Sequence, residues 1–143
     1  SNPTDRSEIT AEHAYAWSDG RVVFASGSPF PSVTLGSRTF EPGQANNVYT
    51  FPGVGLGVTV FGIDRVDDDM FLAAARALSG SVDSGRLRRG AVYPPLTRIR
   101  DVSIEIAAAV GRVACATGAA SVKPPADFRA FVRERMFEPR YPA

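Results

Sequence analysis

The sequence is poor in the side chains that most often carry catalysis and metal binding. It holds one cysteine, one histidine and one lysine. Because Cys115 is alone, an internal disulfide bond and a cluster of thiolate metal ligands are both excluded. His13 has no cluster of acids or cysteines near it, and we interpret it as a surface residue of a helix. Lys123 precedes two prolines, which is a poor setting for an acid–base residue.

Long hydrophobic runs and a strong net charge are absent as well. The most apolar stretch, Val48 to Ile63, contains a proline and several glycines, and it is shorter than the roughly 20 residues that a membrane-spanning helix needs. The formal net charge of +1 gives no reason to expect nucleic acid or a membrane as a partner. No signal-peptide pattern opens the sequence, so we expect a cytoplasmic location, with a mitochondrial one left open.

Apolar periodicity, turns and capping residues predict a helix-rich α/β chain. A helix is expected over Ile9–Trp17 with Thr10 as its N-cap. The continuous apolar run Val22–Ala25 is typical of a short parallel strand. The further expected elements are a small hairpin around Gly36-Ser37, a glycine-rich helix after Asn47, a helix starting at 67–69, a loop with Arg86, Arg88 and Arg89, a long helix over 98–117 ended by Gly118, and a short helix capped by Asp127.

The glycine-rich segment does not match a dinucleotide-binding loop. Gly53-x-Gly55-x-Gly57 lacks the third glycine at the required spacing and follows no strand. Gly53 and Gly57 fall on one face of the expected helix, where each glycine costs about 1 kcal/mol relative to alanine. We therefore predict that another backbone approaches the helix closely at these two positions.

Polar residues stand where strands of the expected sheet end. Asn2 precedes Pro3, which favours extended backbone before it, and Gly27-Ser28 follow the strand run. Ligands of open α/β sheets bind beyond the carboxyl ends of strands, so we expect Asn2 and Gly27-Ser28 to lie side by side. Asn46 and Asn47 stand between a Pro-Gly turn and the glycine-rich helix. One of these amides can cap the helix and the other can bind a carboxylate or carboxamide; two solvated turn residues are the alternative.

Several stretches resemble malic enzymes, in the same order along the chain. Gly43 to Gly53 is similar to the family pattern G-Q-x-N-N-x-Y-x-F-P-G, with Ala45 where many members have glycine. The other stretches are Ser1-Asn2-Pro3-Thr4, Thr10-Ala11-Glu12, Ala14-Tyr15, Phe24 to Phe30, Tyr93-Pro94-Pro95-Leu96 and Val102-Ser103. The resemblance implies the carboxy-terminal part of a malic enzyme. Residues 1–118 would be the second half of a Rossmann-type NAD(P)-binding domain, and 119–143 a carboxy-terminal helix and tail.

The resemblance also implies a function. Malic enzymes oxidatively decarboxylate (S)-malate to pyruvate and CO₂ with NAD or NADP and a divalent metal, Mg²⁺ or Mn²⁺. By motif, Asn2, Asn46 and Asn47 would contact malate and the nicotinamide end of the cofactor, with Gly27 and Ser28 beside them. The family's catalytic tyrosine and lysine, metal-binding acids and phosphate loop match nothing here. We expect a missing amino-terminal part of the same enzyme to supply them, and the intact enzyme to be a homo-oligomer.

Two alternatives stay open. A malolactic-type enzyme has similar motifs but yields lactate without net release of reduced cofactor. A non-catalytic binding or oligomerisation module is the alternative from another class. Product analysis on the intact enzyme separates the first from a malic enzyme, and coding sequence upstream of Ser1 with a tyrosine, a lysine and acidic ligands would exclude the second.

Overall fold

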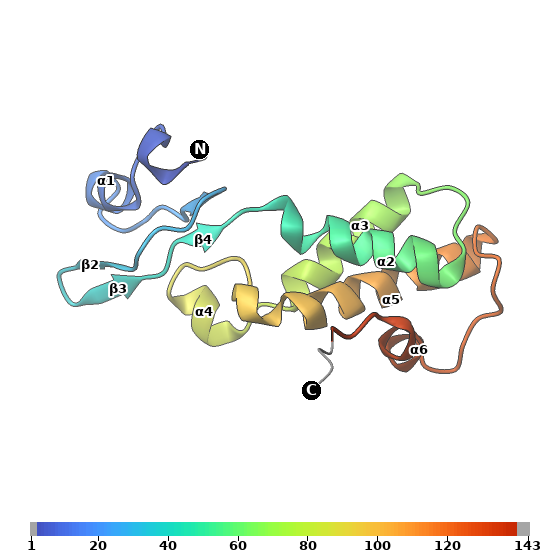
Figure 1. Cartoon of the computed structure of the whole chain (residues 1–143). Helices are drawn as coiled ribbons and strands as arrows, with labels where there is room; N and C mark the ends of the chain where they lie inside the picture. The colour runs from blue at the N-terminus through green and yellow to red at the C-terminus, as the bar shows by residue number, and fades with distance from the viewer. Residues whose placement is uncertain (1–2, 140–143) are drawn as a thin grey trace. The chain divides into compact units, whose positions relative to one another are not determined.

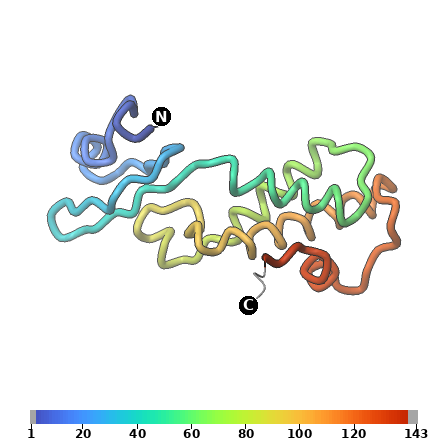
Figure 2. The backbone as a smooth tube through the Cα atoms, viewed as in Figure 1, coloured from blue at the N-terminus to red at the C-terminus, as the bar shows by residue number. Residues whose placement is uncertain are grey.

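The computed structural model describes residues 3–139 (Figure 1, Figure 2), so the predicted site residue Asn2 lies outside the described residues. The chain divides into two compact units. The first unit comprises Ser1–Asn47 and Ser79–Leu96, and the second comprises Val48–Leu78 and Thr97–Ala143. Each unit has its own cluster of buried hydrophobic side chains. The predicted domain boundary at residue 118 stays a prediction.

The first unit is built from short helices and strands. Its elements are η1 (Thr4–Arg6), α1 (Ala11–Trp17), β1 (Ala25–Ser26), β2 (Val33–Leu35), β3 (Arg38–Phe40), β4 (Gly43–Gln44) and α4 (Ser84–Arg88). Thr10 caps α1 as predicted, because its hydroxyl accepts a hydrogen bond from the His13 N–H at 3.2 Å. The ring of Tyr15, fully buried, stacks on Phe40 at 4.5 Å between centroids. This contact anchors α1 on the strands.

The predicted hairpin is confirmed. β2 and β3 pair antiparallel, with Thr34 opposite Thr39 and their hydroxyls 3.2 Å apart. Gly36 adopts a φ of +61° in the turn, a conformation that glycine reaches without steric cost. Figure 2 shows the hairpin as the loop coloured blue to cyan.

The predicted strand Val22–Ala25 needs correction. β1 covers only Ala25–Ser26, and it pairs in parallel with β4 in the register Ala25–Gly43 and Ser26–Gln44. A strand forms only where a neighbouring segment supplies hydrogen-bond partners, and the first such bond runs from the Gly43 N–H to the Phe24 carbonyl at 2.9 Å. The prediction from apolar composition alone therefore starts the strand too early in the sequence.

The basic stretch expected to be a loop is a helix, α4. Asp83 caps it by accepting from the Arg86 N–H at 2.9 Å. The Glu41 carboxylate forms ion pairs with Arg86, at 3.0 Å, and with Arg89. The Glu41 N–H also donates to the Arg89 carbonyl at 2.8 Å. These contacts with a distant part of the sequence fix a helix that is too short to be stable alone.

The second unit is helical. Its elements are η2 (Asn47–Tyr49), α2 (Phe51–Phe61), α3 (Asp68–Gly80), η3 (Leu96–Arg98), α5 (Ile99–Thr117) and α6 (Phe128–Arg135), with η2, α3 and η3 extending into the first unit at one end. α2 packs along α5, and the two helices lie side by side in Figure 1.

The asparagine pair does not cap α2, which begins four residues after Asn47 with Thr50 at its N-cap position. Asn47 instead begins the 3₁₀ turn η2.

The predicted close approach at the two glycines is confirmed. A Cβ built on Gly53 would lie 2.7 Å from the Cβ of Ile106 and 3.2 Å from the Cα of Ser103. A Cβ on Gly57 would lie 3.3 Å from the carbonyl oxygen of Ala107. The absent side chains let α5 pack directly against the backbone of α2, which offsets the cost of glycine within a helix.

The cap of α6 gives a pH prediction. Asp127 Oδ1 accepts from the N–H groups of Ala130, at 3.0 Å, and Arg129, at 2.9 Å. Both bonds lower the pKa of Asp127, and the bond from the Ala130 N–H has the larger effect. A carboxylate with a lowered pKa in the folded state stabilises the fold above its unfolded pKa of about 3.9, and this stabilisation is lost as the pH falls through the folded value.

We therefore expect Asp127→Asn, which keeps a capping oxygen, to reduce the loss of stability on acidification. The measurement is the urea midpoint of the wild-type and variant chains at neutral pH and at about pH 3, below the unfolded pKa of aspartate. The wild-type midpoint should fall more than that of the variant. Equal falls in the two chains would show that the Asp127 cap does not contribute to the acid response.

Candidate functional site

Two neighbouring strand ends form the candidate site. The ladder between β1 and β4 includes bonds from the Gly43 N–H to the Phe24 carbonyl, at 2.9 Å, and from the Ala45 N–H to the Ser26 carbonyl, at 2.8 Å. Because the strands are parallel, the residues that follow them leave the sheet at the same edge. We call Gly27-Ser28 and Asn46-Asn47 together the strand-exit site.

The structure brings predicted residues from the two strand ends into contact. The side-chain Nδ2 of Asn46 donates to the carbonyl oxygen of Gly27 at 3.3 Å. Asn46 is half-buried, whereas Asn47 is exposed at the start of η2. The two amides therefore stand in different surroundings, one against the neighbouring strand end and the other open to solvent.

The serines beside Gly27 are buried. Ser28 is 4% exposed and Ser26 is 6% exposed. The Ser26 hydroxyl has no hydrogen-bond partner among residues 3–139. A buried hydroxyl without a partner is costly, so the Ser26 hydroxyl is an atom that a further hydrogen-bonding group would satisfy.

Gln44, in β4, contacts the strand-exit site and was not among the predicted residues. Its side-chain Nε2 donates to the same Gly27 carbonyl at 3.4 Å. The sequence did carry a signal, since Gln44 is the chain's one glutamine and stands two residues before the asparagine pair. Its target could not be read from the sequence, because it depends on the pairing of β1 with β4.

The donors of the strand-exit site do not fit a divalent metal ion. They are amides, a hydroxyl and backbone carbonyls, whereas Mg²⁺ and Mn²⁺ sites are built around carboxylates. In the described part of the chain, no three His, Cys, Asp or Glu side chains gather into a possible metal site.

Comparison with known proteins identifies the family. Residues 1–115 match the family model described as malic enzyme, NAD binding domain. The chain belongs to the malic enzyme family. This match confirms the predicted family, and the helix-rich chain with a parallel strand pair and a hairpin agrees with the predicted partial Rossmann-type α/β fold.

Relatives of both cofactor types align with nearly the whole chain. The NADP-dependent chloroplastic malic enzyme of Zea mays is 48% identical over 142 residues, which are 99% of this chain and 22% of the relative. An NADP-dependent malic enzyme of Phaseolus vulgaris is 49% identical, covering 99% and 24%. The NAD-dependent mitochondrial malic enzyme of Ascaris suum is 44% identical, covering 99% and 22%.

This malic enzyme chain thus spans less than a quarter of the length of these relatives. The chain represents part of a malic enzyme, as the motifs predicted. An NAD(P)-binding role is likewise supported, with NAD and NADP both represented among the relatives.

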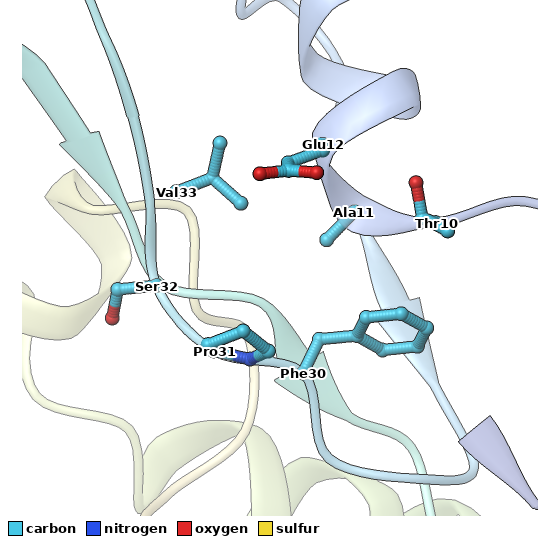
Figure 3. Close-up of a pocket in the computed structure, with 7 residues that line it drawn as sticks. All are labelled: Thr10, Ala11, Glu12, Phe30, Pro31, Ser32 and Val33. Carbon is cyan, nitrogen blue, oxygen red and sulfur yellow. The ribbon is translucent and has the colours of Figure 1, made fainter. Parts of the chain in front are cut away.

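The structure also contains a small cavity of about 210 Å³ in the first unit (Figure 3). It is lined by Thr10, Ala11, Glu12, Phe30, Pro31, Ser32 and Val33. Figure 3 shows the Glu12 carboxylate pointing towards the Val33 side chain. The cavity is smaller than the roughly 300–1,000 Å³ typical of ligand pockets and includes no residue of the strand-exit site.

The apolar stretch of the sequence forms α2 and its flanks. Within residues 3–139, no helix combines the length and hydropathy that crossing a bilayer requires.

Proposed function

We propose that this chain works as part of a malic enzyme that oxidatively decarboxylates (S)-malate to pyruvate and CO₂ while reducing NAD⁺ or NADP⁺. The main support is the match of residues 1–115 to the family's NAD-binding domain. The strand-exit site adds to it, because polar groups lie at the carboxyl ends of parallel strands, where ligands of α/β folds bind.

In this proposal the asparagine pair orients the reactants. An amide offers both a donor and an acceptor, so it can bind a malate carboxylate or the carboxamide of nicotinamide without adding charge. Asn47 is exposed and is assigned to a direct contact. Asn46 donates from Nδ2 to the Gly27 carbonyl and is assigned to orienting the reactants from the neighbouring strand end. Asn2, Gly27 and Ser28 complete the binding residues of the proposal.

A bound NAD⁺ or NADP⁺ would supply the hydride acceptor for malate. The residues of this chain bind and orient, and bringing two reactants into alignment is itself a large part of catalysis. In this proposal the divalent metal, Mg²⁺ or Mn²⁺, is bound by residues outside this chain. Homo-oligomerisation of the intact enzyme and a cytoplasmic location are proposed with it.

Product analysis tests the proposed reaction. The intact enzyme containing this segment is incubated with malate, Mn²⁺ and either cofactor, and the products are separated. The proposal predicts pyruvate and reduced cofactor in equal amounts. Lactate without net reduced cofactor would assign the malolactic reaction instead, and no consumption of malate would leave a non-catalytic module.

We expect the 143-residue chain alone to show no sustained malate-dependent reduction of NAD or NADP. The reaction needs a base, an acid and a metal that holds the developing charge on oxygen. The amides of the strand-exit site cannot transfer a proton at neutral pH. Absorbance of the reduced cofactor, followed with chain free of host malic enzyme, is the measurement. Continued turnover would reveal a catalytic set within these residues.

A further inference from the structure

The carbonyl of Gly27 accepts hydrogen bonds from two side-chain amides of the opposite strand end. Gln44 Nε2 lies 3.4 Å from this oxygen and Asn46 Nδ2 lies 3.3 Å from it. Gln44 is half-buried and stands in β4 directly opposite Ser26. The backbone of Gln44 is part of β4, whereas Asn46 follows the end of that strand.

The backbone ladder alone leaves this region weakly joined. β1 and β4 pair over only two residues each, and Gly27 is the first residue beyond β1. Glycine has more backbone freedom than any other residue, so hydrogen bonds to the Gly27 carbonyl help to keep this residue in one geometry. The two amides supply that restraint at the point where the ladder ends.

We propose that Gln44 is a positioning residue of the malic enzyme site. Together with Asn46, it fixes the Gly27 carbonyl and so sets the distance between the two halves of the strand-exit site. Gln44 makes no contact with a reactant and acts through Asn46-Asn47. The expected effect of Gln44 on malate turnover rests on the proposed function. The expected effect of Gln44 on the geometry of the Gly27 carbonyl does not.

The structural consequence is tested by NMR on the 143-residue chain. Gln44→Met keeps the length of the side chain but removes the amide donor. Loss of a donor should move the carbonyl ¹³C resonance of Gly27 upfield, and Asn46→Ala should do the same. The matched control is Thr39→Val, which removes a hydroxyl of the exposed hairpin. A Gly27 shift in Gln44→Met no larger than in the control would overturn the proposal.

A measurement on the unchanged chain covers the case in which a variant does not fold. The side-chain amide protons of Gln44 should have smaller temperature coefficients than those of the exposed Asn47, because hydrogen-bonded protons move less with temperature. Equal coefficients for the two residues would mean that Gln44 does not hold Gly27 and would reject the proposal.

The kinetic consequence is tested in the intact enzyme. Gln44→Met should lower kcat/KM for malate about fivefold, in the range expected for one hydrogen bond, and mainly through kcat. In an Asn47→Ala background the same change should cost less than about twofold, because a residue that acts through another couples to it. Equal losses in the two backgrounds would contradict a role exerted through Asn47. An enzyme inactive on malate would instead remove the proposed function and leave the NMR result standing.

Discussion

Gly53→Ala is expected to lower the free energy of unfolding of the chain by about 2–3 kcal/mol, while Gly55→Ala, two residues on, is expected to raise it by up to about 1 kcal/mol. The added methyl at Gly53 would meet the Ile106 Cβ at 2.7 Å and the Ser103 Cα at 3.2 Å. Neither atom is the end of a flexible side chain, so α2 and α5 must move apart. At Gly55 nothing lies within 4 Å, and only the gain in helix propensity remains.

Denaturant unfolding of the two variants and the wild type checks this pair. Both substitutions add the same methyl group to the same helix, so the difference between them isolates the packing against α5. Similar unfolding midpoints for Gly53→Ala and Gly55→Ala would contradict the close helix contact.

Asn47→Ala in the intact enzyme is expected to lower kcat/KM for malate by about 10- to 100-fold, which corresponds to losing a hydrogen bond to a charged group. Asn47 is exposed and its amide is not part of the core, so the unfolding temperature should change little. Steady-state kinetics and thermal unfolding of the same preparation separate these two effects. The matched control is Ala45→Ser, a small change at an exposed position two residues away.

Wild-type kinetics in Asn47→Ala would reduce this asparagine to a turn residue. A loss of activity that follows a loss of stability would point to folding rather than to contact with a reactant. The proposal therefore requires both readings, a large kinetic effect and an unchanged unfolding temperature.

Local signals in the sequence predicted much of the fold. The Thr10 and Asp127 caps, the turn at Gly36 and the end of α5 at Gly118, which has a φ of +76°, each depend on a few neighbouring residues. Such features are determined by residues that are close together in the sequence. The glycine face of α2 was also predictable, because Gly53 and Gly57 would be unfavourable in a helix without a close neighbour.

The errors arose where distant residues decide the structure. α4 is held by Glu41, whose partner Arg89 is 48 positions away. β1 begins at Ala25 because its partner is Gly43-Gln44, a segment whose composition does not indicate a strand. The same pairing directs Gln44 towards Gly27, so this contact could not be read from the motif that contains Gln44. The roles of Asn46 and Asn47, which the motif resemblance implies, stay a prediction.

A structure of the intact enzyme with malate and NAD or NADP bound tests the strand-exit site most directly. In this complex we expect the Asn47 amide to lie within about 3.2 Å of a malate oxygen or of the nicotinamide carboxamide, a normal hydrogen-bond distance. We also expect Gln44 and Asn46 still to donate to the Gly27 carbonyl. A bound complex in which neither Asn46 nor Asn47 contacts either reactant would contradict the assignment of the strand-exit site.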